Sequence, residues 1–561
     1  MMHSVWKPIE KRFLQVLTIV WLISSALFWA WWFQLSHIGT SLGFILTSMA
    51  LGWAMLLPGY CLFFVQKMKH PQSKRVPKNY FKVAMVVTKA PSEPLSIVQK
   101  TLLAAKSQTY PHDTWVADED PSKEALTWYK KHGIKVSCRK NALDYHNYSW
   151  PRRTKCKEGN LAYFYDHYGY KKYDIVAQLD ADHVPSRDYL NHILAPFIDE
   201  SVGYVAAPSI CDANAHTSWA ARARLNSEAM FHGPIQAGTN AGWVPICIGS
   251  HYAVRTKALK EIGGIGPELA EDYSTTVAMN AHGWRGVLAY DAVAHGDGPN
   301  NFEDLIVQDY QWSRSLVTLL ITFYRKYWDR LSLKSKIQFT FTQLWYPVSA
   351  LVWLISIVLP VSALLSGVAP VKVNLSDFFT FAAIPQLTIF ILFLFVRYKK
   401  HLRPQNVKLY SWENALFELA RWPWVLAACI DAVIVSLFKI KITFKVTSKN
   451  KSEISLLSVK RVAPYFIVIL LNLYAIMFGY ISNETYGYFI FTTITTVAYL
   501  FLVLLSLSLH MKESVAKNIQ HLITHSRVYI YSFVLLFALM YLFVSQSDPK
   551  LLKQKNNNFI S

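Results

Sequence analysis

Cysteine is scarce in this sequence, and the few cysteines are scattered. The chain has six among 561 residues, at positions without paired spacing: Cys61, Cys138, Cys156, Cys211, Cys247 and Cys429. Structural zinc sites and disulfide frameworks both need cysteines in recurring pairs, so neither is expected. We expect reduced thiols in the cytoplasm.

Signatures of nucleic-acid binding are lacking as well. The sequence contains no homeodomain, zinc-finger or RNA-binding motif, although its formal net charge is +21. Cytoplasmic loops of membrane proteins collect Lys and Arg, which accounts for this charge without nucleic acid. We therefore expect no nucleic-acid partner.

Charged residues are nearly absent from two long segments near the N-terminus, 13–34 and 41–66, in a chain that is 52% hydrophobic. Each segment is long enough to span a bilayer, and only residues 35–40 separate them. The first lacks a small-residue cleavage site, which argues against a removable signal peptide. Basic residues flank the pair on both sides: Lys7, Lys11 and Arg12 before it, and Lys67, Lys69, Lys74, Arg75 and Lys78 after it. The pair is therefore predicted to be a hairpin with both ends in the cytoplasm.

Further apolar segments follow residue 332. Five are long enough to cross a membrane: 339–366, 378–396, 463–482, 486–509 and 528–545. The stretch 410–438 differs, because Glu413, Glu418, Arg421 and Asp431 interrupt its apolar face. We predict that it lies along the membrane surface as an amphipathic helix, which leaves seven spans and an external C-terminus. The lysines after Asp548 conflict with the positive-inside rule, so a count differing by one stays open.

Residues 79–332 form the one long polar stretch, and short apolar runs alternate there with helical segments. The candidate strands are 82–87, 113–117, 134–138, 175–179, 204–207 and 287–289. Strands that alternate with helices predict an α/β domain with a mostly parallel sheet.

Two acidic pairs stand out in this domain. Asp180 and Asp182 follow an apolar run, so their carboxylates are expected at the carboxyl end of a strand, where open α/β sheets bind ligands. Two oxygen ligands suit a hard divalent cation that holds a diphosphate. Glu271 and Asp272 precede a helical segment, where acids also satisfy free backbone N–H groups. Helix capping is therefore an alternative to catalysis for the second pair.

Together these motifs resemble the processive family-2 glycosyltransferases, which include cellulose synthase, hyaluronan synthase and chitin synthase. The resemblance runs from the first strand of the polar domain to Lys449 and implies a GT-A-like nucleotide-sugar transferase domain, inserted in an α-helical transmembrane bundle. The segment from Asp180 to Asp182 matches the family's DxD, which holds the diphosphate through Mg²⁺ or Mn²⁺. Glu271-Asp272 follows Ala270 where the family has Thr-Glu-Asp, and this implies Asp272 as the general base.

Other family motifs imply nucleotide contacts. Glu93 lies in the opening loop, where Pro-Ser replaces the usual Tyr-Asn. We favour Asp118 as the aspartate that corresponds to the family's uridine contact, with Asp120 as the other possible alignment. Lys157 and Gly159 belong to a Lys-x-Gly-Asn-Leu segment near the nucleotide, where a cation suits a diphosphate.

Two further segments imply acceptor contacts. Gly249 and Ser250 correspond to a glycine-containing acceptor loop, in which backbone approaches sugar closely. Gln308 and Trp312 match QxxRW, but Gln311 replaces the arginine that helps to hold the diphosphate. Arg314 is a candidate replacement for that cation. Trp312 suits stacking on a sugar, and an interfacial anchor is the alternative.

The segment from Phe444 to Lys449 resembles the FxVTxK gating loop that folds over the bound nucleotide, with Thr447 at its centre. A basic loop after a membrane helix also occurs without such a role. His183 and His295 lie where some related transferases place a third metal ligand, and we do not assign them that role.

The resemblance implies an inverting, metal-dependent synthase of a β-linked polysaccharide, which uses a UDP-sugar and exports its product through its own helices. The acceptor loop is closer to cellulose-type than to hyaluronan-type sequences, which favours UDP-glucose. The implied partners are the growing glycan, membrane lipid and accessory export or regulatory subunits, and no cyclic-di-GMP receptor domain is expected. We expect an integral protein of the plasma (inner) membrane with a cytoplasmic catalytic domain. Alternatives are a transferase that adds one sugar to a lipid carrier, and an inactive export scaffold.

We predict five parts of the chain: a transmembrane hairpin (1–78), the GT-A-like domain (79–332), a transmembrane helix pair (333–400), the interfacial helix with the gating loop (401–462), and C-terminal transmembrane helices with a short tail (463–561).

Overall fold

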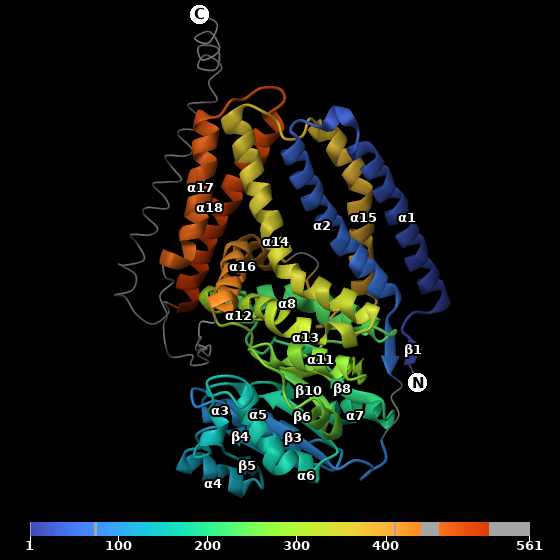
Figure 1. The fold of residues 1–561 in the computed structure, drawn as a ribbon, viewed down its shortest axis with the longest axis vertical. Coiled ribbons are helices and arrows are strands. Elements are labelled where there is room, and N and C mark those ends of the chain that lie inside the picture. Colours follow the sequence, from blue (N-terminus) through green and yellow to red (C-terminus); the bar gives the residue numbers. More distant parts are fainter. Residues whose placement is uncertain (1, 72–75, 409–410, 439–458, 515–561) are drawn as a thin grey trace, which may run out of the picture.

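The computed structural model describes residues 2–71, 76–408, 411–438 and 459–514. Long helices form one end of the molecule, and an α/β domain forms the other (Figure 1). The long helices are α1 (Pro8–Trp32), α2 (Ser41–Gln66), α14 (Leu333–Ser366), α15 (Leu375–Tyr398), α16 (Trp412–Phe438), α17 (Val459–Phe478) and α18 (Tyr486–Ser514). Each contains a stretch that is long and apolar enough to cross a membrane, so the chain is an integral membrane protein.

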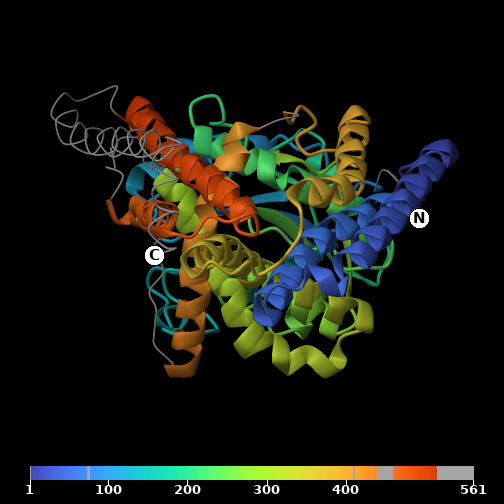
Figure 2. The ribbon, with the colours of Figure 1, turned by 90° about the horizontal axis from the view of Figure 1, so that it is seen from above.

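Six of the seven predicted spans coincide with long helices: α1, α2, α14, α15, α17 and α18. The seventh, 528–545, lies outside the described residues. Seen from above, α14 lies between the α1–α2 pair and the α17–α18 pair (Figure 2), and it packs against α2, α17 and α18. One helix therefore joins the two sides of the bundle.

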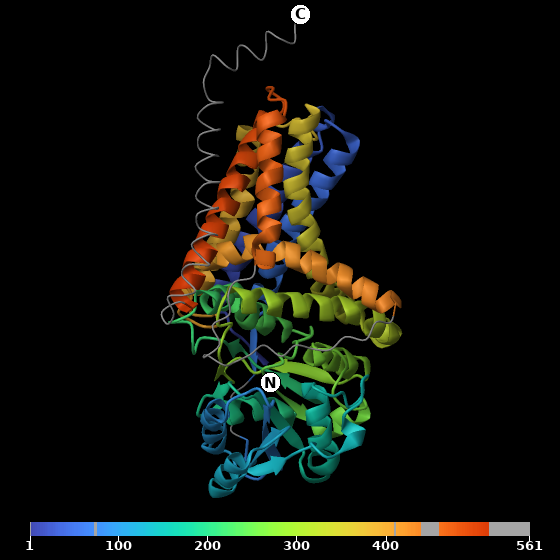
Figure 3. The same ribbon diagram turned by 90° about the vertical axis from the view of Figure 1, so that its left-hand side faces the viewer.

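Helix α16 lies across the direction of the other long helices and runs beside α12 (Phe302–Leu319) (Figure 3). Three of the charged residues that interrupt its apolar face, Glu413, Arg421 and Asp431, contact neighbouring helices. Arg421 binds Asp309 of α12 through two hydrogen bonds of 2.6 and 3.1 Å. Asp431 accepts a hydrogen bond of 3.1 Å from Tyr310, also on α12. Charge in this helix thus fixes its contact with α12.

The domain is built on a mixed sheet of seven strands. Their order across the sheet is β11 (Arg285–Leu288), β8 (Val202–Ala206), β10 (His251–Arg255), β6 (Ile175–Asp180), β3 (Val83–Lys89), β4 (Asp113–Asp118) and β5 (Lys135–Ser137). All pairs are parallel except the two that β10 makes, with β6 and β8. The predicted α/β class and mostly parallel sheet are confirmed. Strand β10 was missed, because its sequence was interpreted as part of the acceptor loop.

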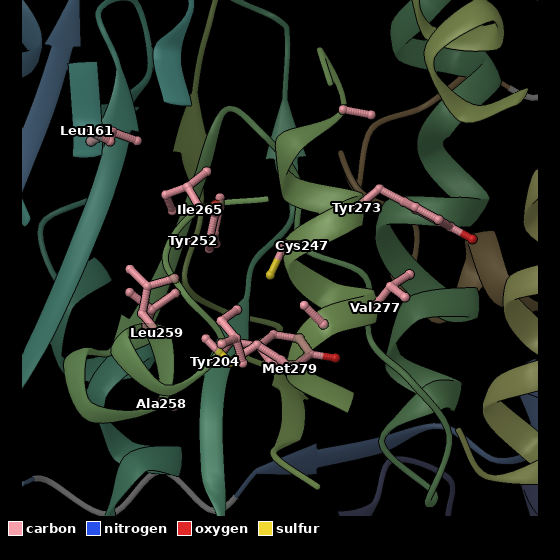
Figure 4. Packing of buried hydrophobic residues seen from close by; sticks show 14 of the residues in the cluster. Leu161, Tyr204, Cys247, Tyr252, Ala258, Leu259, Ile265, Tyr273, Val277 and Met279 are labelled. Carbon is pink, nitrogen blue, oxygen red and sulfur yellow. The ribbon is translucent and has the colours of Figure 1, made fainter. Parts of the chain in front are cut away.

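Buried side chains cover both faces of the sheet. Along β3, Val83, Met85 and Val87 enter one core, whereas Ala84 and Val86 enter the other. This alternation follows from the two-residue period of a strand, and it explains why β3 is continuously apolar. Figure 4 shows the second core around Tyr252, Cys247 and Tyr273, between the sheet and the helices beside it.

Smaller elements complete the domain. The helices are α3 (Leu95–Lys106), α4 (Lys123–Lys131), α5 (Lys157–Phe164), α6 (Tyr170–Lys172), α7 (Tyr189–Leu194), α8 (Trp219–Met230), α9 (Gln236–Thr239), α10 (Thr256–Glu261), α11 (Glu271–Ala281), α12 and α13 (Arg325–Tyr327). Strands β7 (Val184–Pro185), β12 (Ala294–His295) and β9 (Ser209–Ile210) form a small sheet, and β1 (Met2–Ser4) pairs with β2 (Lys69–Pro71). Side-chain oxygens of Ser122, Ser218, Asn301 and Ser332 cap the starts of α4, α8, α12 and α14.

The first turns of α14 are part of the domain. The side chain of Gln338 accepts a hydrogen bond from the Val244 backbone N–H and donates one to the Val244 carbonyl. The hydroxyl of Tyr273, on α11, donates to the carbonyl of Phe339. The same helix thus enters the bundle and supports the domain.

Candidate active site

The two aspartates of the first acidic pair lie at the carboxyl end of β6. Asp180 is the last residue of the strand and is partly exposed, whereas Asp182 is buried. The backbone N–H of Asp180 donates to the carbonyl of Ser250, at 2.8 Å. The predicted acceptor loop therefore lies directly against the first aspartate.

Lys157, the first residue of α5, joins the two acidic pairs. Its Nζ lies 2.5 Å from Oδ1 of Asp180 and 4.0 Å from Oε1 of Glu271, and it also donates to the carbonyl of Gly249. Burial alone would lower the pKa of this lysine, but the Asp180 and Glu271 carboxylates outweigh that effect and raise it. The cation of Lys157 thus interacts with the carboxylates of Asp180 and Glu271. The carboxylate of Asp272 also contributes to its raised pKa.

Glu271 and Asp272 form the first turn of α11. Burial raises the pKa of both carboxyls, and the cation of Lys157 opposes the rise. Oδ1 of Asp272 accepts a 2.7 Å hydrogen bond from the Tyr273 N–H, as the capping interpretation predicts. Oε1 of Glu271 is buried and has no hydrogen-bond partner within the described part of the chain, and its nearest cation is Nζ of Lys157 at 4.0 Å.

Gly249 is packed against the second acidic pair. A Cβ at this position would lie 3.3 Å from Oδ2 of Asp272 and 3.7 Å from Oε1 of Glu271. Contacts at the shorter distance are tighter than side chains normally allow, so a larger residue would displace the carboxylates. Close approach of backbone to this pair is the physical reason for glycine here.

The site has a donor set that suits a divalent cation. Ligand atoms of Asp180, Asp182 and His183 lie within 4.8 Å of one another. Nδ1 of His183 is 3.1 Å from Oδ1 of Asp182, and its Nε2 is 3.2 Å from the hydroxyl of Ser209. Burial would lower the pKa of His183, but Asp182 outweighs it and raises the pKa to about 10. The two carboxylates fit Mg²⁺ or Mn²⁺, and His183 orients the second.

Asp118 and Asp120, the two candidate uridine contacts, lie at the carboxyl end of the same strand, β4, but have different surroundings. Asp118 is fully buried, and its carboxylate contacts Lys89 at 3.3 Å and the Tyr129 hydroxyl at 2.9 Å. Asp120 is half exposed and pairs with Lys140 at 2.6 Å. A cavity of about 440 Å³ opens beside this pair, lined by Pro121, Cys138, Lys140, Asn141, Ala142 and Tyr163. The geometry favours Asp120 over Asp118 as the residue that a ligand reaches.

Two other predicted nucleotide residues have local structural contacts. Oε2 of Glu93 accepts a 2.8 Å hydrogen bond from the Ala90 N–H within the opening loop. A Cβ at Gly159 would lie 2.2 Å from the carbonyl of Arg153, so glycine is required by packing there. Phe444, Thr447 and Lys449 lie outside the described residues.

The predicted acceptor residues on α12 lie near the start of α11. The hydroxyl of Ser315 accepts a 3.0 Å hydrogen bond from the N–H of Ala270, which precedes Glu271. Gln308, Gln311 and Trp312 lie along the preceding turns of α12. Arg314, suggested as the replacement cation, is paired instead with Asp431 of α16 at 3.4 Å.

Arg224, the cation that contacts Trp312, was not predicted from the sequence. Arg224 of α8 places its guanidinium carbon 3.6 Å from the centre of the Trp312 ring, and its Nη1 donates to Gln308 at 3.0 Å. Arg224 has an obvious local partner in Glu228, four residues later, so its sequence surroundings indicate only a helix ion pair.

Comparisons with known proteins agree with this site. Residues 175–398 match the model of Glycosyl transferase family group 2. A cellulose synthase catalytic subunit (UDP-forming) of Pseudomonas fluorescens (strain SBW25) is 27% identical over 244 residues, which cover 41% of this chain and 30% of the relative. The corresponding protein of Xanthomonas axonopodis pv. citri (strain 306) is 24% identical over 311 residues, or 52% of this chain and 40% of the relative. The matches thus cover less than half the length of these relatives.

Among solved structures, a mannosyltransferase from Pyrobaculum calidifontis in complex with GDP-Man and Mn²⁺ matches with a TM-score of 0.37 and 14% identity, over 82% of this chain and 98% of that one. The family match begins at β6 and ends at α15, so it contains both acidic pairs and α12. The chain therefore carries a glycosyltransferase domain of family group 2.

Proposed function

We propose that the protein is an inverting, metal-dependent processive glycosyltransferase, which polymerises a β-linked polysaccharide from a UDP-sugar and passes it across the membrane. The observation that carries this proposal is the meeting of both acidic pairs at Lys157. A diphosphate needs a cation-rich pocket, and a glycosyl acceptor needs a base within reach of the same carbon atom.

Each group has a distinct role in this proposal. Asp180 and Asp182 would hold Mg²⁺ or Mn²⁺, and a bound cation would supply neutralisation of charge on the departing diphosphate. Lys157 donates hydrogen bonds to the same diphosphate. Its contact with Asp180 supports this role, because it holds the lysine cation beside the first of the two proposed metal ligands. Fixed charges that are already in place stabilise the leaving group without reorganisation.

Asp272 is the proposed general base. It removes the proton from an acceptor hydroxyl as that oxygen forms a bond to the anomeric carbon. The bond from that carbon to the diphosphate breaks, and the electron pair leaves with the nucleotide. One displacement inverts the configuration, so an α-linked donor gives a β-linked product. A raised pKa suits this role, because proton transfer is efficient when the base titrates near the working pH.

The membrane helices and the relatives extend the proposal to the product. The relatives are named as UDP-forming cellulose synthases, which supports a UDP-sugar donor and favours UDP-glucose. The domain adjoins the bundle (Figure 1), and α12, which carries Trp312, packs against α14 and α16, so a growing glycan would enter the bundle directly from the site. We place the catalytic domain in the cytoplasm, where UDP-sugars are available, and accessory export or regulatory subunits remain part of the proposal.

Product analysis with the purified protein in lipid vesicles tests this function. The protein is incubated with a panel of UDP-sugars plus Mn²⁺ or Mg²⁺, UDP release is measured, and the product is digested with linkage-specific hydrolases. We expect a polymer from one UDP-sugar, and Asp272→Asn should lower UDP release by at least about 100-fold. Asp329→Asn, at an exposed position outside the site, is the matched control.

Other outcomes would contradict the proposal in different ways. A single sugar on a lipid carrier would show a non-processive transferase, which Gln311 in place of arginine would explain. Release of UDP that survives Asp272→Asn would exclude this residue as the base. Failure of every UDP-sugar would favour an export scaffold.

A further inference from the structure

The described part of the chain holds a cluster of polar and aromatic side chains between α8 and α12 that the reaction scheme above does not use. The guanidinium of Arg224 lies over the ring of Trp312 at 3.6 Å, and its Nη1 donates to Oε1 of Gln308 at 3.0 Å. Its other two nitrogens contact the carboxylate of Glu228 at 2.8 and 3.2 Å. The arginine is 10% exposed, so four contacts fix a buried planar group.

The charge of this cluster is balanced. Burial would raise the pKa of Glu228, but Arg224 and His232 outweigh it and lower the pKa to about 2. Nε2 of His232 lies 3.4 Å from Oε2 of the same carboxylate. Glu228 therefore stays ionised and neutralises the guanidinium, whose hydrogen bonds are directed at protein acceptors.

The position of the arginine matters because α12 lacks one beside its tryptophan. Gln311 occupies the place where the family motif has arginine, and Arg314 is held by Asp431. The cation beside Trp312 therefore comes from a different helix. Because a planar guanidinium stacks on an aromatic ring, Arg224 covers one face of the indole. The half-buried tryptophan can then offer only its other face.

We propose that Arg224 is a positioning residue, which holds Trp312 in one orientation as a single-faced stacking platform for the acceptor sugar. This inference rests on the proposed function. It assigns no phosphate contact to Arg224, because Glu228 and Gln308 already engage the guanidinium. Lys157 then remains the cation that meets the diphosphate. Loss of Arg224 should impair sugar transfer to the acceptor more than donor binding.

This inference is tested by measuring how much of the consumed donor sugar enters polymer and how much is transferred to water by hydrolysis. For Arg224→Ala in vesicles, we expect the amount of sugar incorporated per UDP released to fall about tenfold, with donor KM within about twofold of the unaltered protein. Arg222→Ala is the matched control, because Arg222 lies on the same helix and pairs with Glu413 of α16 instead of Trp312. Thermal stability of both variants is measured alongside.

Two further variants separate positioning from simple structural damage. Arg224→Lys keeps the charge but loses the planar contact, so it should resemble Arg224→Ala. The double variant Arg224→Gln/Gln311→Arg returns an arginine to α12 and should recover much of the incorporation.

Several results would overturn the inference. These are equal incorporation in Arg224→Ala and Arg222→Ala, a main effect on donor KM, and full activity in Arg224→Lys. If the unaltered protein released no UDP, the proposed function itself would have failed. If it made polymer while the Arg224 variants behaved like the control, only this inference would have failed.

Discussion

At the scale of single residues, the site concentrates acidic groups where burial opposes their ionisation. Glu271 and Asp272 are adjacent, and burial raises the pKa of both carboxyls, with Lys157 as the neighbouring cation that limits the rise. Such an arrangement stabilises the protonated forms, whereas a base must be ionised to act. Catalysis and folding therefore make opposite demands on these two residues.

The pH dependence of activity should show the raised pKa of Asp272. We expect kcat to decline on the acid side with a midpoint above the ordinary aspartate value of about 3.9, because protonation of Asp272 would remove the proposed base. The measurement is the initial rate of UDP release at saturating donor across the pH range. A midpoint near the ordinary aspartate value would contradict a buried base.

Thermal stability should change with pH in the opposite direction. A carboxyl whose pKa is raised in the folded state binds its proton more tightly there than in the unfolded chain. Its contribution to stability is present at low pH and is lost as the pH rises through the raised value. The double variant Glu271→Gln/Asp272→Asn should lack this contribution and serves as the control.

Most of this site could be predicted from sequence motifs, because each acidic residue lies at the end of a strand or the start of a helix, and local sequence patterns indicate both. Asp180, Glu271 and Lys157 are examples, and the structure places them together. The contact between Arg224 and Trp312 was out of reach, since it depends on how two distant helices cross. Asp118 had a matching local pattern as well, yet the structure buries it among protein partners.

At the scale of elements, the most informative departure from expectation is α16. The sequence shows charges within an apolar helix, and exposure at a membrane surface is the simplest explanation of that pattern. The structure pairs Arg421 with Asp309, whose neighbour in sequence is Gln308. Periodicity reveals that a helix has a polar side, but not which neighbouring helix supplies the partners.

Breaking this buried pair should destabilise the protein. Asp309 is 4% exposed and Arg421 is 15% exposed. Arg421→Leu removes the arginine that binds the buried Asp309 carboxylate, whereas Asp309→Leu leaves Arg421 with only the more exposed Glu418, at 3.1 Å. We expect each single variant to lower the free energy of unfolding by about 3–5 kcal/mol and the double variant to recover a large part of it. Thermal unfolding in detergent, analysed as a double-mutant cycle, measures this coupling.

An exposed ion pair provides the control for that cycle. Lys372 and Glu484 are 44% and 54% exposed, and removing either should change stability by less than about 1 kcal/mol. If the effects of Asp309→Leu and Arg421→Leu were additive, the pair would not hold α16 to α12.

At the scale of the whole molecule, three connections between long helices, α1 to α2, α14 to α15 and α17 to α18, lie at the end of the bundle opposite the domain (Figure 1). Thr40 donates a backbone hydrogen bond to Pro370, and Lys372 contacts Glu484, so three connections meet there. If the domain is cytoplasmic, this end must face the opposite side of the membrane. The sequence predicted the spans, but not how their connections meet.

Cysteine labelling of intact cells tests this orientation. Leu35, in the connection after α1, and Leu143, in the domain, are both 84% exposed. In a background without the native cysteines, Leu35→Cys should react with a membrane-impermeant maleimide in intact cells. Leu143→Cys should react only after permeabilisation, and the reverse result would contradict a cytoplasmic domain.

Helix α14 has a further consequence for the enzyme in its bilayer. Its 34 residues give about 50 Å of helix measured along its axis, well beyond the roughly 30 Å of hydrocarbon that a span needs to cross. The first turns of α14 form hydrogen bonds with Val244 and Tyr273, and Tyr273 directly follows Asp272 of the candidate active site. We therefore expect the proposed site to stay at a constant height above the lipid tails. Changes in bilayer thickness should tilt the bundle and the domain together. The distance from the candidate active site to the hydrocarbon core should then stay the same.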